Sequence, residues 1–187
     1  MWVVRHGETE WSAEGRHTST TDVPLTARGR EEARAIGPRL ARHAFAEVWT
    51  SPRVRATDTG RLAGFGDRQE VVEDLREWDY GEDEGRTTAQ IQEERPGWSI
   101  WRDGPKGGET IEQAGERADR VVARAREVTG DVLCFAHGHL LRIVAARWLG
   151  LPPADGRLFS LGSGRVSVLG WERETAVIDR WNESRRG

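Results

Sequence analysis

Two histidines of this chain occupy the same local setting. His6 and His137 each follow a short apolar segment, and each is followed by glycine, in Arg5-His6-Gly7 and His137-Gly138-His139. Ligands of an open α/β sheet bind outside the carboxyl ends of its strands, so these two histidines could meet at one site. The glycines would let backbone N–H groups approach an anion there. One such histidine is more often structural, but two together, one of them preceded by arginine, predict a functional site.

Arginine beside these histidines suits a phosphate. The guanidinium group is planar, stays charged and donates two parallel hydrogen bonds to a pair of oxygens. Arg5 precedes His6, and Arg55 lies near the start of a helix that Ser51-Pro52 opens, where anions are favoured. Compositional bias explains most of the other arginines, because Lys106 is the only lysine among the 28 Lys and Arg residues. Lys106 lies in no Gly-x-x-x-x-Gly-Lys-Ser/Thr motif, so the sequence shows no P-loop.

A metal site is the rival interpretation of the histidines. His137-x-His139 has ligand spacing, but the surrounding sequence supplies arginines in place of a further cluster of His, Cys or Asp ligands. Arg5 next to His6 would also repel a cation. We therefore expect no metal and no other cofactor.

The histidines need a sheet to bring them together, and the apolar pattern predicts one. The predicted strands are 2–4, 45–50, 71–72, 131–136, 166–169 and 176–179. The predicted helices are 26–43, 51–62, 87–94, 110 to about 125, and 139–149, and Thr110 begins the fourth of them. Residues 95–109 are predicted to form an ordered loop or lid. This alternation predicts one α/β domain over residues 1–187. Its fold would be a three-layer α/β/α sandwich with a mostly parallel sheet and an antiparallel edge strand.

Composition limits the partners. A net charge of −3 argues against nucleic acid or an anionic membrane as the main partner. Cys134 is the only cysteine and cannot form an internal disulfide, which suits a reducing compartment. No apolar segment approaches the ~20 residues of a membrane span, and the N-terminal one is too short for a signal peptide. We expect a cytoplasmic protein, in which Trp171 or Trp181 could mark a homodimer interface or only the edge of the core.

Six segments, in order along the chain, carry a family resemblance. They are Arg5-His6-Gly7-Glu8-Thr9-x-Trp11, Gly15-Arg16-His17-Thr18, Asp22-x-Pro24-Leu25-Thr26-x-x-Gly29, Ser51-Pro52-x-x-Arg55-Ala56, Leu75-x-Glu77-x-x-x-Gly81-x-x-x-Gly85 and Ala136-His137-Gly138. Together they resemble the histidine phosphatase superfamily, the phosphoglycerate mutase-like family, over most of the chain. The resemblance implies the fold of that family and phosphoryl transfer through a phosphohistidine.

The resemblance also implies roles for residues at matching positions. His6 is the expected nucleophile, and Glu77 is the expected proton donor and later base. The expected pocket for the phosphoryl oxygens is formed by Arg5, Arg55 and His137. Further expected phosphate or substrate contacts are Gly7, Ser12, Thr18, Ser19, Gly138 and His139. Ser12 replaces the asparagine usual in the family, Ser19 replaces a glycine, and His139 replaces an asparagine common among the mutases.

The chemistry of phosphoryl transfer agrees with these roles. The reaction needs an in-line nucleophile and positive charge at the phosphoryl oxygens, which two guanidinium groups and a protonated His137 could supply without Mg²⁺. A glutamic acid that must begin protonated predicts a mildly acidic pH optimum.

Three functions remain open. The favoured one is a phosphatase of broad specificity that hydrolyses monoesters of small phosphorylated metabolites. The second is a phosphoglycerate mutase or a sugar-bisphosphatase, and the third is a non-catalytic phosphate-binding module. Mutases that resemble this chain carry a longer basic insert after the glutamate, whereas residues 85–109 contain no adjacent pair of basic residues. The segment around Glu77, with Trp98 and Trp101 beyond it, resembles bacterial broad-specificity acid phosphatases and sugar-bisphosphatases of the superfamily.

Overall fold

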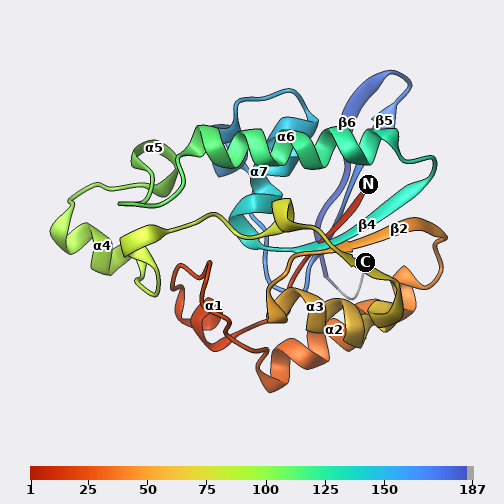
Figure 1. Cartoon of the computed structure of the whole chain (residues 1–187), viewed down its shortest axis with the longest axis horizontal. Helices are drawn as coiled ribbons and strands as arrows, with labels where there is room; N and C mark the ends of the chain where they lie inside the picture. The colour runs from red at the N-terminus through yellow and green to blue at the C-terminus, as the bar shows by residue number, and fades with distance from the viewer. Residues whose placement is uncertain (185–187) are drawn as a thin grey trace.

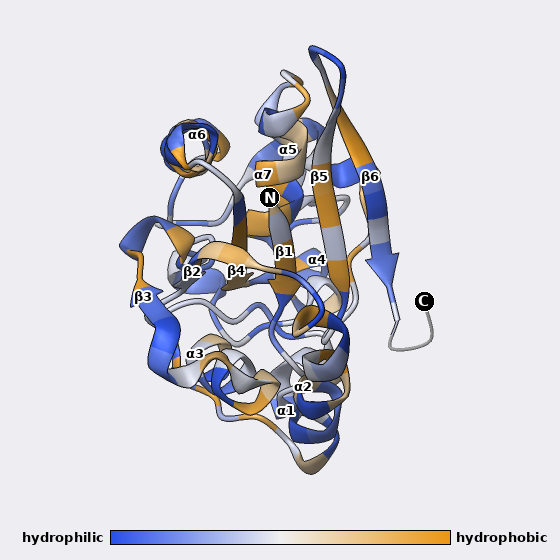
Figure 2. Cartoon of the chain, turned by 90° about the vertical axis from the view of Figure 1, so that its right-hand side faces the viewer, coloured by the Kyte–Doolittle hydropathy of each residue, from blue (hydrophilic) through white to orange (hydrophobic). Residues whose placement is uncertain are grey.

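The apolar segments form one six-stranded sheet. The computed structural model describes residues 1–184. The strands are β1 (Trp2–Arg5), β2 (Phe45–Thr50), β3 (Gln69–Val71), β4 (Asp131–Ala136), β5 (Val166–Glu172) and β6 (Thr175–Glu183), in the order β3-β2-β4-β1-β5-β6. Strands β3, β2, β4 and β1 are parallel, and β5 runs antiparallel to both β1 and β6. The predicted mostly parallel sheet with antiparallel pairing at one side is confirmed (Figure 2).

Helices cover both faces of this sheet. Successive side chains of a strand point to opposite faces, so Leu133 and Phe135 of β4 join one apolar cluster while Cys134 and Ala136 join the other. Helices α2 (Ala27–Leu40) and α3 (Val54–Gly60) lie on the first face, and α6 (Ile111–Glu127) and α7 (Gly138–Trp148) lie on the second (Figure 1). The three-layer sandwich is therefore confirmed.

Polar side chains begin the helices where the sequence predicts. The Thr26 hydroxyl accepts from the backbone N–H of Gly29, and Thr110 and Gln113 form a reciprocal capping box at the start of α6. Arg53 offers no cap to α3, and Asp22, from a distant loop, accepts from the backbone N–H of Val54 at 2.9 Å instead. None of the helices in residues 1–184 combines the length and hydropathy that crossing a membrane requires.

Several elements differ from the prediction. A short helix, α1 (Glu10–Glu14), occupies part of the polar loop after β1, and α4 (Thr88–Glu94) is followed by α5 (Ile100–Asp103) inside the segment predicted as a loop or lid. Strands β5 and β6 are longer than predicted because a turn of only two residues, Arg173 and Glu174, joins them. Short helical turns complete the chain: η1 (Arg61–Phe65), η2 (Gly66–Arg68), η3 (Glu73–Leu75), η4 (Gly81–Asp83) and η5 (Pro153–Leu158).

Candidate active site

The register of β1 and β4 brings the two strand-end histidines together. Arg5 pairs with Ala136, so the next residue of each strand, His6 and His137, lies at the same edge of the sheet. The two ring centroids are 5.2 Å apart, as the sequence pattern predicts for a shared site. Nδ1 of His6 lies 2.8 Å from the carbonyl oxygen of Gly7. An Nδ1–H that donates to this carbonyl leaves the lone pair of the ring on Nε2.

The surroundings of His6 keep its ring neutral. Burial, and then the charges of Arg5 and Arg55, hold the pKa of His6 well below its usual 6.5. Its side chain is buried, with 5% of the residue exposed. A neutral imidazole with a free Nε2 is a competent nucleophile even in mildly acidic solution.

His137 is also neutral in this structure. Nε of Arg55 donates to its Nδ1 at 3.2 Å, so Nε2 carries the proton and donates to the Ser51 hydroxyl at 2.7 Å. Burial, and then the neighbouring Arg55, place the pKa of His137 well below 6.5. The sequence prediction assigned this ring a positive charge. The structure differs because Arg55 already occupies the nitrogen that would take up the proton.

Arg5 lies beside Gly138 at the start of α7. A Cβ atom at position 138 would lie 3.3 Å from both Cζ and Nε of Arg5, so the glycine leaves room for the guanidinium group. Nη1 of Arg5 donates to the carbonyl of Leu161 at 2.5 Å. Its Nε is buried and has no hydrogen-bond partner within residues 1–184. Arg5 therefore offers one buried, unsatisfied N–H group, that of Nε, at the carboxyl edge of the sheet.

Arg55 is completely buried and holds the loop after α1. Its Nη1 donates to the carbonyl of Thr21 at 3.0 Å, and its Nη2 donates to those of Thr18 and Ser19, both at 3.1 Å. The carboxylate of Glu84 accepts from the backbone N–H groups of Ser19 and Thr21 in the same loop. The loop is thus fixed from two sides.

Glu77 reaches the same edge from the segment before η4. Its Oε1 accepts from the backbone N–H groups of Trp78 at 2.9 Å and Leu140 at 2.8 Å, and its Oε2 accepts from that of His139 at 3.1 Å. Two of these three donors belong to the first turn of α7, where backbone N–H groups have no partner within the helix. They fix the direction of a buried carboxyl group.

A buried ion pair supports the backbone that carries Glu77. Arg117 of α6 donates to both carboxylate oxygens of Glu109, Nε to Oε1 at 2.9 Å and Nη2 to Oε2 at 2.7 Å. The same guanidinium donates to the backbone carbonyls of Asp74, Arg76 and Glu77 at 2.8, 2.6 and 3.4 Å. We call this arrangement the Arg117–Glu109 clamp.

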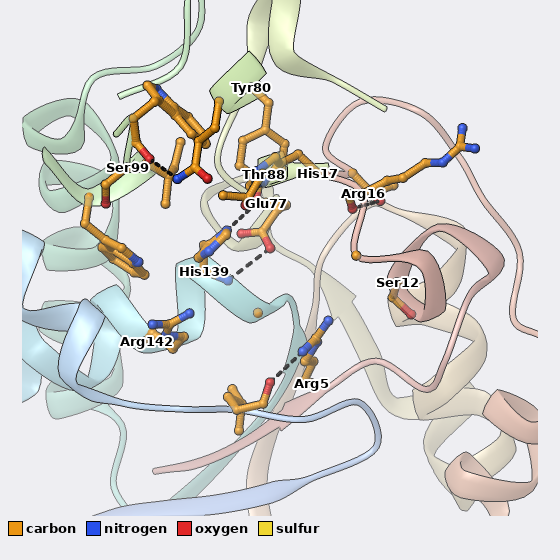
Figure 3. Close-up of a pocket in the computed structure, with 18 residues that line it drawn as sticks. Arg5, Ser12, Arg16, His17, Glu77, Tyr80, Thr88, Ser99, His139 and Arg142 are labelled. Atoms are coloured by element: carbon orange, nitrogen blue, oxygen red, sulfur yellow. Dashed lines mark hydrogen bonds between the residues drawn. The ribbon is translucent and has the colours of Figure 1, made fainter. Parts of the chain in front are cut away.

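A pocket of about 440 Å³ opens in front of these groups. Six of the predicted site residues line it: Arg5, Ser12, Thr18, Glu77, Gly138 and His139. Figure 3 shows Arg5 below Glu77, and the backbone of His139 bonded to the Glu77 carboxyl group. The other five predicted residues do not line the pocket and are buried: His6, Gly7, Ser19, Arg55 and His137.

Several predicted contact residues already have partners in the protein. The N–H of Gly7 donates to the Thr59 hydroxyl at 3.0 Å, and a Cβ at position 7 would lie 2.3 Å from the carbonyl oxygen of Gly29. Glycine is required at position 7 because two backbones pack closely there, and its N–H group is not free to bind an anion. The Ser12 hydroxyl forms the capping box of α1 with Thr9.

The remaining predicted contacts also bond within the protein. The Thr18 hydroxyl donates to the carbonyl of Arg16, and the Ser19 hydroxyl donates to that of Glu77 at 3.4 Å. Nδ1 of His139 and the Tyr80 hydroxyl share a hydrogen bond of 2.6 Å.

Several further residues line the pocket that the sequence analysis did not name as site residues. They are His17, Tyr80, Arg142 and residues of the predicted lid, including Trp98 and Trp101. The ring of His17 stacks on that of His139 at 5.8 Å, and burial lowers the pKa of His17 to about 4. Arg142 carried a local signal, because it follows Gly138 by four residues and so lies on the same face of α7. His17 belongs to one of the six segments of the family resemblance.

Comparisons with known proteins agree with this geometry. Residues 1–184 match the model of the histidine phosphatase superfamily (branch 1). An acid phosphatase of Mycobacterium tuberculosis is 43% identical over 185 residues, which cover 95% of this chain and 91% of the relative. A sedoheptulose 1,7-bisphosphatase of Saccharomyces cerevisiae is 40% identical over 182 residues, covering 80% of this chain and 67% of that protein.

A solved structure of an open reading frame product from Mycobacterium tuberculosis superposes with a TM-score of 0.94. It is 40% identical, and the match covers 98% of this chain and 97% of that one. The paired histidines, the family model and these relatives lead to one conclusion: the chain belongs to branch 1 of the histidine phosphatase superfamily.

Proposed function

We propose that this protein hydrolyses phosphate monoesters of small metabolites through a covalent phosphohistidine on His6. The observation that carries the proposal is the buried, neutral ring of His6, whose Nδ1 is held by Gly7 and whose Nε2 is left to attack. Arg5 and Glu77 lie at the same edge of the sheet and line the pocket. A family phosphatase with these groups needs no further residue to perform both chemical steps.

In the first step, Nε2 of His6 attacks phosphorus in line with the ester oxygen. The P–N bond forms as the P–O bond breaks, and the Glu77 carboxyl group gives its proton to the departing alkoxide. The N–H groups of Arg5, together with the charge of Arg55, stabilise the negative charge on the phosphoryl oxygens. Nδ1–H of His6 stays bonded to Gly7, so the phosphorylated ring, which becomes cationic, has a fixed acceptor for its remaining proton.

In the second step, the Glu77 carboxylate removes a proton from water. The resulting hydroxide attacks phosphorus, the P–N bond breaks, and inorganic phosphate leaves with neutral His6 restored. We propose that the reaction needs no metal, because two arginines can neutralise the phosphoryl oxygens by themselves. Because Glu77 is proposed to donate a proton in the first step, we also propose that activity is highest in mildly acidic solution.

We further propose broad specificity for phosphorylated metabolites over a mutase function. Supporting this choice, the relatives with 43% and 40% identity are a phosphatase and a bisphosphatase. A pocket of about 440 Å³ is far larger than a phosphoryl group and has room for an organic moiety. Isomerisation of 3-phosphoglycerate faster than its hydrolysis would instead favour the mutase.

The test follows phosphate release from p-nitrophenyl phosphate in the presence of EDTA. The unaltered protein should turn over steadily, and quenching in alkaline detergent should trap a base-stable phosphoprotein that loses its phosphate in acid. His6→Ala should lose at least ~10³-fold in kcat and leave no trapped phosphate, since it removes the nucleophile. Substantial turnover by His6→Ala would contradict the mechanism.

Glu77→Gln separates the role of the proton donor from that of the nucleophile. A general acid contributes about 10²–10⁴-fold, most of all where the leaving group is strongly basic. Phosphorylation of Glu77→Gln by glycerol 3-phosphate should therefore slow far more than phosphorylation by p-nitrophenyl phosphate. Equal slowing with both esters would remove Glu77 from the role of acid.

Two other sequence predictions carry forward as proposals. Cys134, the only cysteine, is a buried free thiol in β4, which is compatible with a cytoplasmic setting. Trp171 is half exposed on β5 and is the first residue to replace when testing for a homodimer by light scattering.

A further inference from the structure

The proton of the nucleophilic ring is held by one peptide unit. Nδ1 of His6 donates to the carbonyl oxygen of Gly7 at 2.8 Å, and this carbonyl belongs to the peptide that joins Gly7 to Glu8. In a neutral imidazole, the hydrogen bond at one nitrogen decides which nitrogen carries the proton. If the Gly7 carbonyl turned away, the proton could move to Nε2, and the lone pair that attacks phosphorus would be lost. The direction of this peptide therefore controls the nucleophile.

Glycine at position 7 leaves that direction to be fixed by other groups. A glycine backbone turns more freely than that of any other residue. The preceding peptide, between His6 and Gly7, is held at both ends. Its carbonyl accepts from the backbone N–H of Gly164 at 3.0 Å, and its N–H donates to the Thr59 hydroxyl at 3.0 Å. The peptide that follows Gly7 needs a restraint of its own.

The carboxylate of Glu32, on α2, supplies this restraint. Its Oε2 accepts from the backbone N–H of Glu8 at 3.0 Å. Because a peptide unit is planar, a bond that fixes the N–H of Glu8 also fixes the carbonyl of Gly7. Within residues 1–184 this N–H has no second acceptor, so removing Glu32 would leave it without a partner. A chain of two hydrogen bonds thus joins Glu32, through one peptide, to Nδ1 of His6.

The side chain of Glu32 is itself held in place. Its Oε1 accepts from Nε of Arg28, one turn earlier on α2, at 3.2 Å, which leaves Oε2 for Glu8. A Cβ at position 164 would lie 2.8 Å from the Cβ of Glu32, so Gly164 lets its loop lie directly against this side chain. Arg28 is 72% exposed, and an exposed ion pair contributes little to stability. The bond to the backbone of Glu8 is therefore the more consequential of the two.

We propose that Glu32 is a positioning residue for the nucleophile: its carboxylate holds the peptide between Gly7 and Glu8 so that the proton of His6 stays on Nδ1. The inference rests on the proposed phosphatase function and adds to it a residue that does not line the pocket. What Glu32 contributes is an acceptor oxygen at the right reach, and its charge is secondary.

Three substitutions separate the acceptor from the charge. Glu32→Gln keeps an acceptor oxygen at the same reach and should retain kcat for p-nitrophenyl phosphate within about threefold. Glu32→Met keeps the length of the side chain without the acceptor and should lower kcat ~10–100-fold, as expected for the loss of a hydrogen bond to a charged group. Glu32→Asp keeps the charge but is one methylene short, so kcat should fall at least ~5-fold. It also carries the comparison if the methionine variant does not fold.

Two measurements distinguish positioning from a general structural effect. Inorganic phosphate should inhibit every variant with a Ki within about threefold of the unaltered protein, because the pocket residues are unchanged and the loss lies in kcat. Nitrogen-15 NMR reports the tautomer of each of the five histidines, and the absence of one ring from His6→Ala assigns His6. The proton should stay on Nδ1 of His6 in Glu32→Gln and should shift toward Nε2 in Glu32→Met and Glu32→Asp.

Two neighbours on α2 provide matched controls. Glu31→Met makes the same substitution at the adjacent, exposed position. Arg28→Gln removes the ion pair with Glu32 and leaves the bond to the N–H of Glu8 intact. Both controls should retain kcat within about twofold, since neither touches the peptide that holds His6.

The proposal would be overturned if Glu32→Met, or Glu32→Asp in its place, kept kcat within twofold or kept the proton of His6 on Nδ1. A glutamine variant as slow as the methionine variant, or an equal loss in either control, would also overturn it. None of these outcomes affects the proposed phosphatase, which fails if the unaltered protein does not hydrolyse p-nitrophenyl phosphate or if His6→Ala does. The tautomer of His6 can be measured without turnover, so the two failures are distinguishable.

Discussion

Removing Arg117 should destabilise this protein far more than removing its neighbour Arg120. Both arginines of α6 make bidentate bonds to a carboxylate, Arg117 to Glu109 and Arg120 to Asp74. The Arg117 side chain is 1% exposed, whereas that of Arg120 is 59% exposed. The two pairs therefore share geometry, helix and charge, and they differ in burial.

The magnitudes result from that difference. Breaking a buried pair leaves an uncompensated charge and costs ~3–5 kcal/mol, while an exposed pair contributes ~0–1 kcal/mol. Arg117→Met also removes three bonds to the carbonyls of Asp74, Arg76 and Glu77, so we expect the upper end of the range. For a domain of this size the melting temperature should fall by roughly 6–20 °C in Arg117→Met and by less than about 4 °C in Arg120→Met.

Urea unfolding, monitored by the fluorescence of the nine tryptophans, measures both variants. The double variant Arg117→Met/Glu109→Leu removes both charges and should recover a large part of the loss. Equal losses in Arg117→Met and Arg120→Met would refute the assignment of the buried pair as the support of this segment. The assignment would also be refuted if the double variant lost as much free energy of unfolding as Arg117→Met and Glu109→Leu lose together as single changes.

Three other variants test individual groups of the site. His17 has a pKa of about 4 in the folded state and about 6.5 when unfolded, so the unfolded state binds more protons between these values and stability falls as pH drops below 6.5. By pH 4 the loss amounts to about 3 kcal/mol. In urea unfolding, the stability of His17→Gln should depend on pH less steeply than that of the unaltered protein, by up to ~1.4 kcal/mol per pH unit between about pH 4.5 and 6, with no difference near pH 7.5; an unchanged slope would contradict this. Gly7→Ala forces a Cβ to 2.3 Å from the carbonyl oxygen of Gly29 and should lower stability by ~1–3 kcal/mol in thermal unfolding. Gly138→Ala places its methyl group 3.3 Å from Arg5 and should lower kcat/KM for p-nitrophenyl phosphate. Its melting temperature should fall less than that of Gly7→Ala. A larger fall in Gly138→Ala than in Gly7→Ala would refute these explanations of the two glycines.

The sequence predicts the sheet and the meeting of its two histidines because both depend on strong local signals. A continuous apolar strand such as β4 has few alternative placements, and the parallel register of β1 and β4 then places His6 and His137 at one edge of the sheet. Helix α1 escaped prediction because it has five residues and none of them is buried, so no apolar stripe marks it. Its capping box uses Ser12 in place of the Glu or Gln that identifies the motif in a sequence.

Other features of the site have no local signal or one that is easily missed. The pocket wall combines His17, Tyr80, Trp101 and Arg142 from four separate segments, and only tertiary structure brings them together. Arg117 does leave a trace, because it falls between Ala114 and Val121 on the buried face of α6. A charged residue on an apolar helix face predicts a buried partner, although the sequence does not say which carboxylate supplies it.

The hydrogen bonds of Arg5 and Arg55, the two arginines predicted to hold the phosphoryl oxygens, separate their roles. A guanidinium group has five N–H donors. Arg55 uses four of them on His137, Thr21, Thr18 and Ser19, which leaves one free. Arg5 uses one, on Leu161. While this arrangement lasts, only Arg5 has the free donors for a bidentate bond to a phosphoryl group. We therefore propose that Arg55 acts through its charge and through the proton position it imposes on His137.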